Sequence, residues 1–332
     1  MKKFKVAMVG CGVISANHLA AINTLDYVEV AALCDINIAK ARARRDEYAP
    51  KAAVFDDYVV MMNSVELDAV HIATPHYLHA DMAIFALQKG VNVFLEKPMC
   101  INREEIKKLL DAEKQSKAKI TVCFQNRFNP STVLARQIAD DDGGVLSAYC
   151  SVFWNRDEKY YVDSGWRGSY ATEGGGVMIN QAIHTIDLLC QFLGKPSRLW
   201  ATKANHHLKG IIKVEDTCEG LIEFENGKRA NFYTTTAFPG GNITSVFLKT
   251  KNHKIEIKSP YLYLDGKLIA EPDKDLKYIS KECYGNGHFD MISMFYDALR
   301  NGKEMPVSLE SAQYAVRVLL AAYKSCDEET PI

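Results

Sequence analysis

The first 124 residues of the chain alternate between short apolar segments and longer amphipathic ones. Short, β-branched apolar segments, typical of buried parallel strands, lie at 4–9, 28–34, 69–73, 91–95 and 120–124. Helical patterns separate them at 13–25, 38–48, 77–89 and 103–117. Strands and helices that alternate over short connections predict a doubly wound parallel sheet with helices on both faces, the Rossmann arrangement.

Such a sheet binds its ligand at the carboxyl ends of the strands. The loop after the first strand reads GCGVIS. Gly10 allows a tight turn and Gly12 allows the backbone to approach a pyrophosphate, while Ser15 replaces a third glycine that serves helix packing. Asp35 ends the next strand, at the distance expected for a carboxylate that binds the adenosine ribose. These features predict a dinucleotide site.

The same acid bears on which dinucleotide binds. The Asp35 carboxylate would repel a 2′-phosphate, so we expect NAD as cofactor, with NADP disfavoured. Arg42, Arg44 and Arg45 lie further along the next helix and are interpreted as a solvated face.

The second half of the chain has a different pattern. Strand-like segments lie at 145–154, 198–206, 217–225, 229–237, 244–250 and 254–258, and helical ones at 288–300 and 309–325. Asn226 and Gly227 form a hairpin turn signal between two of the strands. We therefore predict a first domain at 1–128 and an α/β domain with an open, mostly antiparallel sheet at 129–332. Whether the C-terminal helix packs back on the first domain is left open.

Composition excludes several classes of protein. A net charge of −1 argues against nucleic acid or an anionic membrane as partner, and no segment approaches the roughly 20 apolar residues of a membrane span. The nine cysteines include no CxxC pair, which argues against a disulfide framework or a zinc site and favours the reducing cytoplasm. The segment before Cys11 resembles a lipoprotein signal, but its apolar run is too short, so export is not expected.

Four motifs carry a family resemblance. They are Gly10-Cys11-Gly12 with His18, Ala73-Thr74-Pro75 with His79, Glu96-Lys97-Pro98, and Gly174-Gly175-Gly176 with His184 and Asp187. In this order, over nearly the whole chain, they resemble the glucose–fructose oxidoreductase and inositol dehydrogenase (Gfo/Idh/MocA) family. The resemblance implies a Rossmann domain followed by a domain whose open sheet supports the substrate pocket and the contacts of a homodimer or homotetramer.

The resemblance also implies the catalytic groups. Lys97 follows a strand, often with a cis peptide before the next proline, and its cation can stabilise an alkoxide. His184 is implied to be the acid/base, a role that suits a pKa near neutral. Asn180, His184 and Asp187 have helical spacing and are predicted to share one helix face. Many relatives carry aspartate at the position of Asn180, which puts in doubt a relay built on a carboxylate beside His184.

The remaining candidates fall into two sets. Cofactor contacts are expected from Gly10, Gly12, Val13, Ile14, Asp35, Thr74, Pro75, His79, Glu96, Lys97, Gln125, Trp166 and Arg167. Substrate contacts are expected from Asn180, Tyr160, Tyr161, Asn155 and Arg127. His71 is interpreted as a satisfied core residue, His206 and His207 as surface residues, and no metal site is expected.

The leading hypothesis is an NAD-dependent oxidoreductase that transfers a hydride between nicotinamide and a secondary hydroxyl or carbonyl of a sugar, polyol or sugar derivative. Two alternatives are an NAD-dependent glycosidase-type enzyme of the same fold and a non-catalytic, cofactor-sensing regulator. Retention of Lys97 and His184 weighs against the regulator. No motif distinguishes a free sugar, an inositol, a nucleotide-linked sugar or a small diketone.

Overall fold

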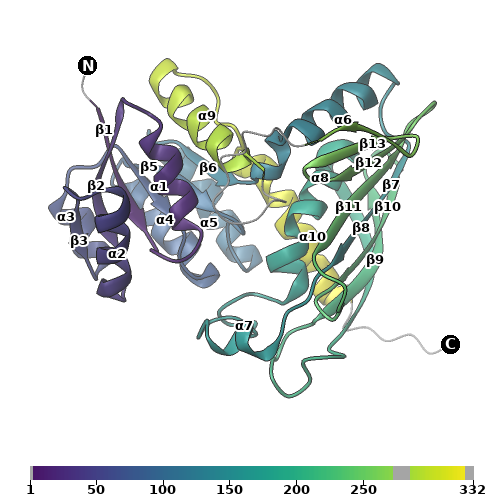
Figure 1. Cartoon of the computed structure of the whole chain (residues 1–332), viewed down its shortest axis with the longest axis horizontal. Helices are drawn as coiled ribbons and strands as arrows, with labels where there is room; N and C mark the ends of the chain where they lie inside the picture. The colour runs from purple at the N-terminus through teal and green to yellow at the C-terminus, as the bar shows by residue number, and fades with distance from the viewer. Residues whose placement is uncertain (1–2, 272–284, 326–332) are drawn as a thin grey trace. The chain divides into compact units, whose positions relative to one another are not determined.

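The computed structural model describes residues 3–271 and 285–325 (Figure 1). These residues form two compact units. The first unit contains 3–100, 104–125 and 285–311, and the second contains 101–103, 126–271 and 312–325. The chain therefore returns to the first unit after completing most of the second.

The first unit is built on a six-stranded sheet in the order β3-β2-β1-β4-β5-β6, in which every neighbouring pair is parallel. Its strands are β1 Phe4–Val9, β2 Val28–Cys34, β3 Ala53–Phe55, β4 Ala69–Ile72, β5 Asn92–Glu96 and β6 Ile120–Cys123. This is the doubly wound order of dinucleotide-binding folds and confirms the predicted Rossmann domain. The four residues of β4 and of β6 are all buried, as a strand covered on both faces requires.

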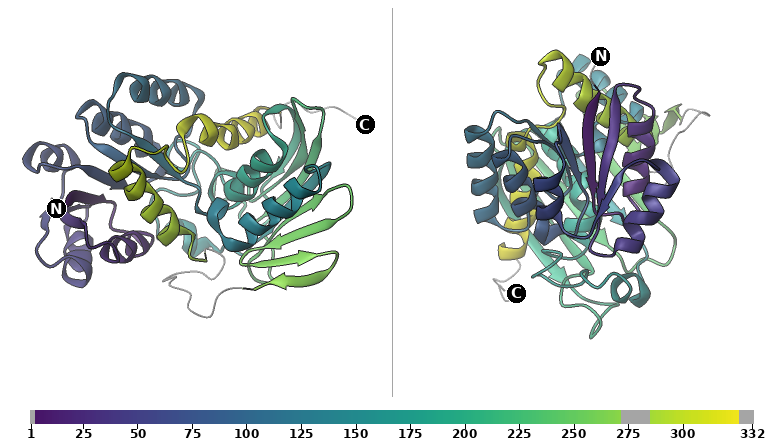
Figure 2. Two further views of the ribbon diagram at one scale, coloured as in Figure 1. Left: turned by 90° about the horizontal axis from the view of Figure 1, so that it is seen from above. Right: turned by 90° about the vertical axis from the view of Figure 1, so that its left-hand side faces the viewer.

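Helices cover both faces of this sheet (Figure 2). They are α1 Ser15–Asn23, α2 Ile38–Tyr48, α3 Tyr58–Ser64, α4 His79–Gln88, α5 Arg103–Gln115 and α9 Gly287–Asn301, with a 3₁₀ turn, η1, at His76–Leu78. Helix α9 packs against α1. The sequence places α9 in the second domain, but this packing groups it with the first unit.

The second unit contains an eight-stranded sheet in the order β14-β13-β12-β11-β7-β10-β9-β8. Its strands are β7 Ser147–Phe153, β8 Pro196–Ala204, β9 Thr217–Phe224, β10 Arg229–Thr235, β11 Ile243–Lys249, β12 Lys254–Lys258, β13 Tyr261–Leu264 and β14 Lys267–Ala270. Only β7 and β10 pair in parallel; the other pairs are antiparallel, as predicted. The hairpin between β9 and β10 turns at Gly227, whose φ is +78°.

Helices α6 Pro130–Asp141 and α8 Ile183–Leu193 pack on one face of the second sheet (Figure 1). A five-residue π-helix, η3 Met178–Ala182, leads into α8, and two further helices are α7 Glu158–Val162 and α10 Leu309–Ser325. The opposite face carries exposed aromatic side chains, including Tyr149, Trp200 and Tyr233. Among residues 3–271 and 285–325, no helix is long and apolar enough to cross a membrane.

Candidate functional site

The two glycines of the first loop serve different purposes. Gly10 has a φ of +85°, and a Cβ there would lie 2.4 Å from the carbonyl oxygen of Ala73, so the protein's own packing requires glycine. A Cβ at Gly12 would meet no protein atom within 4 Å. Glycine at this position therefore leaves open space at the carboxyl end of β1, as a loop that cradles a phosphate requires.

Asp35 is held against this loop from the end of β2. Its carboxylate accepts hydrogen bonds from the backbone N–H of Cys11 at 2.7 Å and of Asn37 at 2.8 Å. Burial, and then the nearby charge of Asp35, raise the pKa of the Cys11 thiol to about 12. Cys11 is therefore a small, protonated packing residue, because only a thiolate is an effective nucleophile.

Arg44 differs from its expected place on a solvated face. Its guanidinium donates to Ser15 Oγ and to the carbonyl oxygen of Gly12, both at 3.3 Å, and pairs with Glu47 at 2.8 Å. Ser15 is itself fully buried and donates to the Gly12 carbonyl at 2.6 Å. Ser15, which replaces the third glycine, thus stabilises the loop through the Gly12 carbonyl, and Arg44 from α2 contacts the same carbonyl. Arg42 is exposed, and Arg45 pairs with Asp46 on the surface.

The residues after β4 and β5 are tied together by His79. The ring of His79 is buried, with Nδ1 2.7 Å from the carbonyl oxygen of Pro98 and Nε2 2.9 Å from that of Thr74. Lys97 precedes Pro98, is half-buried, and is joined to it by the cis peptide that the resemblance implies. The His79 ring therefore joins the two strand ends, with Nδ1 at the Lys97–Pro98 turn and Nε2 at Thr74.

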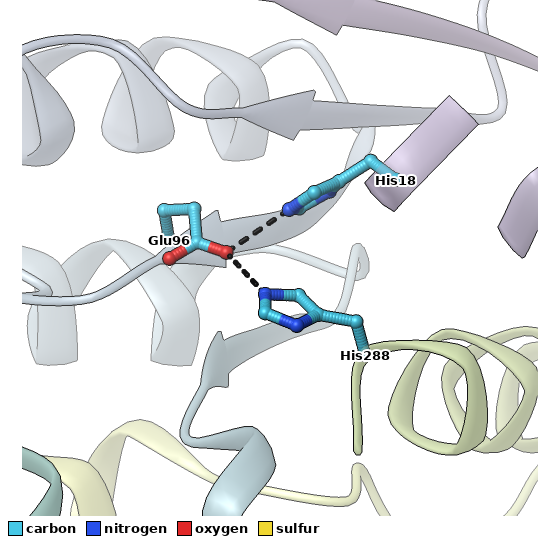
Figure 3. A group of neighbouring side chains, drawn as sticks. All are labelled: His18, Glu96 and His288. Carbon is cyan, nitrogen blue, oxygen red and sulfur yellow. Dashed lines mark hydrogen bonds and ion pairs between the residues drawn. The ribbon is translucent and has the colours of Figure 1, made fainter. Parts of the chain in front are cut away.

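Glu96 lies at the centre of a buried cluster in the first unit (Figure 3). Its Oε1 is 3.0 Å from His18 Nε2 and 3.5 Å from His288 Nε2, and its Oε2 accepts the Lys97 N–H at 3.2 Å. Burial alone would raise the pKa of Glu96, but hydrogen bonds from the two histidines outweigh it and hold that pKa well below the usual range. Glu96 is thus an ionised carboxylate that faces histidines and the backbone of the proposed catalytic lysine.

The cluster continues away from Glu96. His18 Nδ1 lies 2.9 Å from His71 Nδ1, and His71 Nε2 lies 2.7 Å from the Tyr296 hydroxyl. This confirms His71 as a satisfied core residue. His288 and Tyr296 come from α9, and sequence reasoning missed both because no local motif marks them.

The ligand atoms of His18, Glu96 and His288 lie within 4.8 Å of one another, a spacing that a metal ion also permits. The distance from His18 to Glu96 is that of an ordinary hydrogen bond.

In the second unit, Asn180 lies on η3 and contacts a carboxyl group. Its Nδ2 donates to Glu173 Oε1 at 2.5 Å and to the Tyr160 hydroxyl at 3.3 Å. Glu173 is fully buried, and its other oxygen accepts the N–H of Gly168 at 2.6 Å. π-Helical turns are frequent at functional sites, so the placement of Asn180 on one is notable.

Arg127 and Asp187 form a bidentate ion pair. Arg127 Nε donates to Oδ2 at 2.7 Å and a terminal nitrogen donates to Oδ1 at 2.5 Å, while Asp187 is buried on α8. These two donors of Arg127 anchor the helix that bears His184, and the substrate contact expected of Arg127 stays a prediction. His184 is buried on the same helix.

The other predicted substrate residues divide between surface and core. Tyr160 is stacked by the guanidinium groups of Arg156 and Arg167 at 4.9 and 4.6 Å from its ring centre. Tyr161 is 4% exposed and packs in an apolar cluster, so its ring is core. Asn155 is exposed. His206 and His207 are exposed, as predicted.

The three-glycine segment is explained by packing. A Cβ at Gly175 would lie 1.9 Å from the Tyr323 hydroxyl, and one at Gly176 would lie 1.8 Å from the carbonyl oxygen of Glu215. The buried Glu215 carboxyl accepts the N–H groups of Gly176 and Met178 at 3.0 to 3.2 Å. Together with Gly174, where a Cβ would lie 2.6 Å from Ile101, these glycines let the segments of Ile101, Tyr323 and Glu215 approach the start of η3.

Comparisons with known proteins agree with this geometry. Residues 4–124 match the profile described as an oxidoreductase family with an NAD-binding Rossmann fold, and residues 134–257 match the GFO/IDH/MocA C-terminal domain. The chain is 27% identical to the D-glucoside 3-dehydrogenase of Escherichia coli, over 99% of this chain and 97% of that protein. It is 34% identical to the inositol 2-dehydrogenase of Salmonella typhimurium, but that match spans only 41% of either chain.

Solved structures also resemble the whole chain. The WlbA dehydrogenase of Bordetella pertussis, in complex with NADH and UDP-GlcNAcA, is similar with a TM-score of 0.86, at 26% identity over 100% of both chains. A levoglucosan dehydrogenase shares the fold with a TM-score of 0.88, at 19% identity over 99% of this chain and 98% of that one.

Proposed function

This chain belongs to the GFO/IDH/MocA family of NAD-binding oxidoreductases, and we propose that it is an NAD-dependent dehydrogenase acting on a secondary hydroxyl of a sugar, polyol or sugar derivative. The relatives at hand support this substrate class, since their names include a glucoside dehydrogenase and an inositol dehydrogenase.

The observation that carries the proposal is the open space at Gly12 beside a fixed Asp35. A Cβ at Gly12 would meet no protein atom within 4 Å, so glycine there has no packing reason and suits a bound pyrophosphate. Asp35 would bind the ribose hydroxyls. The bound cofactor supplies the hydride acceptor or donor, and the protein supplies orientation and charge.

We propose NAD over NADP because of the carboxylate at Asp35. Arg44 lies beside the same loop, but Glu47 pairs with it at 2.8 Å and offsets its charge. Fluorescence titration with NADH and with NADPH tests this directly. Tighter binding of NADPH would contradict it.

We propose that Lys97 and His184 move the substrate proton. The Lys97 ammonium would stabilise the negative charge that develops on the substrate oxygen, and the His184 imidazole would take the hydroxyl proton during oxidation. Lys97→Ala and His184→Ala should each lower turnover by at least about 10²-fold while NADH binding persists. Lys89→Ala and His206→Ala, on the surface, serve as matched controls.

The substrate is found with a panel read as NADH absorbance. The panel includes myo-inositol, glucosides and UDP-linked sugars, since the names and complexes of the relatives include an inositol, a glucoside and UDP-GlcNAcA, and free sugars are added to it. NADH formation from at least one member supports a dehydrogenase. Release of an aglycone without net NADH would favour the glycosidase alternative, and NADH binding with no turnover of any kind would favour a regulator.

We further propose a homo-oligomer formed through the exposed aromatic face of the second sheet, because large apolar patches on a single chain are usually covered. The reducing cytoplasm is the proposed compartment, since the seven cysteines among residues 3–271 are buried thiols.

A further inference from the structure

The amide of Asn180 lies against a carboxyl group that no sequence motif assigned. Glu173 is fully buried directly before the three-glycine segment, and its backbone N–H donates to the Ser169 carbonyl at 2.8 Å. Its Oε1 lies 2.5 Å from Asn180 Nδ2 and its Oε2 accepts the N–H of Gly168 at 2.6 Å. A carboxyl group therefore stands beside position 180, although residue 180 is itself an amide.

The contact can persist in both protonation states of Glu173. An ionised carboxyl group accepts from the Asn180 NH₂ group, as the structure shows. A protonated one would donate to the Asn180 oxygen after a half-turn of the amide, which exchanges its oxygen and nitrogen with little change of shape. The Tyr160 hydroxyl, now an acceptor at 3.3 Å from Nδ2, would become a donor to that oxygen.

We propose that Glu173 is a positioning residue: its ionisation decides whether Asn180 offers its oxygen or its nitrogen to a substrate hydroxyl. The proposal rests on the proposed function in giving Asn180 a substrate contact. With Glu173 ionised, the amide directs its oxygen away from Glu173 and accepts a hydrogen bond. With Glu173 protonated, the Asn180 nitrogen faces away from Glu173 and donates a hydrogen bond to the substrate.

The groups around Glu173 bring its ionisation near neutral pH. Burial raises the pKa of Glu173 to about 7, against the opposing effects of the Gly168 and Asn180 hydrogen bonds and of the Arg167 charge. Glu215 raises it further, and Tyr160 and Tyr161 are the other titratable groups that face Glu173. Neither tyrosine ionises near neutral pH, because burial raises the pKa of both.

The amide itself reports the switch, whether or not a substrate is known. In full-length protein with ¹⁵N-labelled asparagine, the Asn180 side-chain signal, assigned by its loss in Asn180→Ala, should shift with a midpoint near pH 7. In Glu173→Gln the shift should vanish, because glutamine does not titrate: its oxygen accepts the Gly168 N–H and its NH₂ group donates to the Asn180 oxygen at every pH, as a protonated Glu173 would. In Glu215→Gln, which removes another buried carboxyl with a pKa of about 7, the shift should remain. An Asn180 signal that does not move between pH 5 and pH 9 in the wild type would overturn the proposal.

Activity tests the consequence for the substrate. With whichever of myo-inositol, D-glucose or a UDP-linked sugar turns over, wild-type kcat/KM should change by about fivefold or more between pH 6 and pH 8 beyond the change seen in Glu173→Gln. In an Asn180→Ala background, Glu173→Gln should have no further effect on the profile. Identical wild-type and Glu173→Gln profiles, with a titrating amide, would overturn the positioning role. Lack of turnover with a titrating amide would instead count against the proposed dehydrogenase, so the two failures are distinguishable.

Discussion

Single residues in the first loop carry separate requirements for folding and for binding. Gly10→Ala should lower the free energy of unfolding by about 2 kcal/mol or more, because φ is positive and the new Cβ meets the Ala73 carbonyl. Gly12→Ala should change that free energy by less than about 1 kcal/mol but weaken NADH binding at least about tenfold. Urea unfolding and NADH fluorescence measure the two quantities. Equal effects of the two variants on NADH binding, with no stability difference, would refute this division.

The Asp35 carboxylate should determine the preference for NADH over NADPH. Asp35→Ser removes the carboxylate that repels a 2′-phosphate and leaves Arg44 beside the loop. The ratio of NADPH to NADH affinity should rise by about tenfold or more, which is about 1.4 kcal/mol. Asp46→Ser, on the exposed side of α2, is the matched control. An unchanged ratio would show that Asp35 does not select the cofactor.

The buried carboxyl of Glu173 also affects stability. Its folded pKa of about 7 exceeds the unfolded value near 4.5, so the folded state binds more protons between these pH values and stability falls as pH rises through them. Above pH 7 this costs on the order of 3 kcal/mol. Glu173→Gln should therefore unfold at a higher urea concentration than wild type at pH 8, and the gain should shrink toward pH 5. A larger gain at pH 5 than at pH 8 would contradict the sign.

Helix α9 supplies His288 and Tyr296 to the buried histidine cluster, whose other members are His18, His71 and Glu96. His288→Ala should lower the free energy of unfolding at pH 7 by about 2–4 kcal/mol, because it removes a partner of a buried carboxylate. His253→Ala, whose exposed ring pairs with Asp265 at 2.8 Å, should cost less than about 1 kcal/mol.

The cluster also sets a pH dependence. Burial lowers the folded pKa of His18 and His71, so the unfolded state takes up more protons as pH falls below about 6.5, and stability is lost with them. The depressed pKa of Glu96 acts with the same sign at still lower pH. When urea unfolding is measured from pH 7 to pH 5, the free energy of unfolding of the wild type should fall. The fall should be smaller in the variant His71→Gln.

Some helices and strands could be predicted from the sequence, and others could not. Long periodic segments such as β2 and α2 were predicted with the bounds that the structure has. Strand β3 has only three residues, none of them buried, and is too short for a periodic pattern to reveal it. Helix α6, β13 and β14 were missed because they are ordered by contacts within the second unit.

The same limit applies to the site residues. Gly10, Asp35 and the Lys97–Pro98 turn follow from local chemistry at strand ends. The contacts of His288 and the Arg127–Asp187 pair join segments that meet only in the fold, so a single sequence does not show them. Glu173 is near Asn180 in the chain, but no motif marks it. Arg44 shows the converse, because a helix face that looks solvated in the pattern can lie against a loop.

The exposed face of the second sheet bears on the oligomeric state of the protein. Tyr149, Trp200 and Tyr233 are 47%, 49% and 39% exposed on one face. Trp200→Asp should dissociate the proposed oligomer, because a charge is costly to bury in an apolar interface. Analytical ultracentrifugation should show lower mass for this variant and unchanged mass for the control Val59→Asp, which lies on α3. A wild type that sediments as a monomer would refute the interface.

The chain from Tyr296 to Glu96 also fixes the tautomers of two histidines. Glu96 is ionised, so His18 must carry its proton on Nε2 and leave Nδ1 as an acceptor. His71 must then be protonated on Nδ1, and its Nε2 accepts from the Tyr296 hydroxyl. All the donors point the same way, so the bond dipoles add along the chain and end on the carboxylate beside Lys97. The imidazole protons are shielded from water, and they should exchange with deuterium far more slowly than those of His206 or His207.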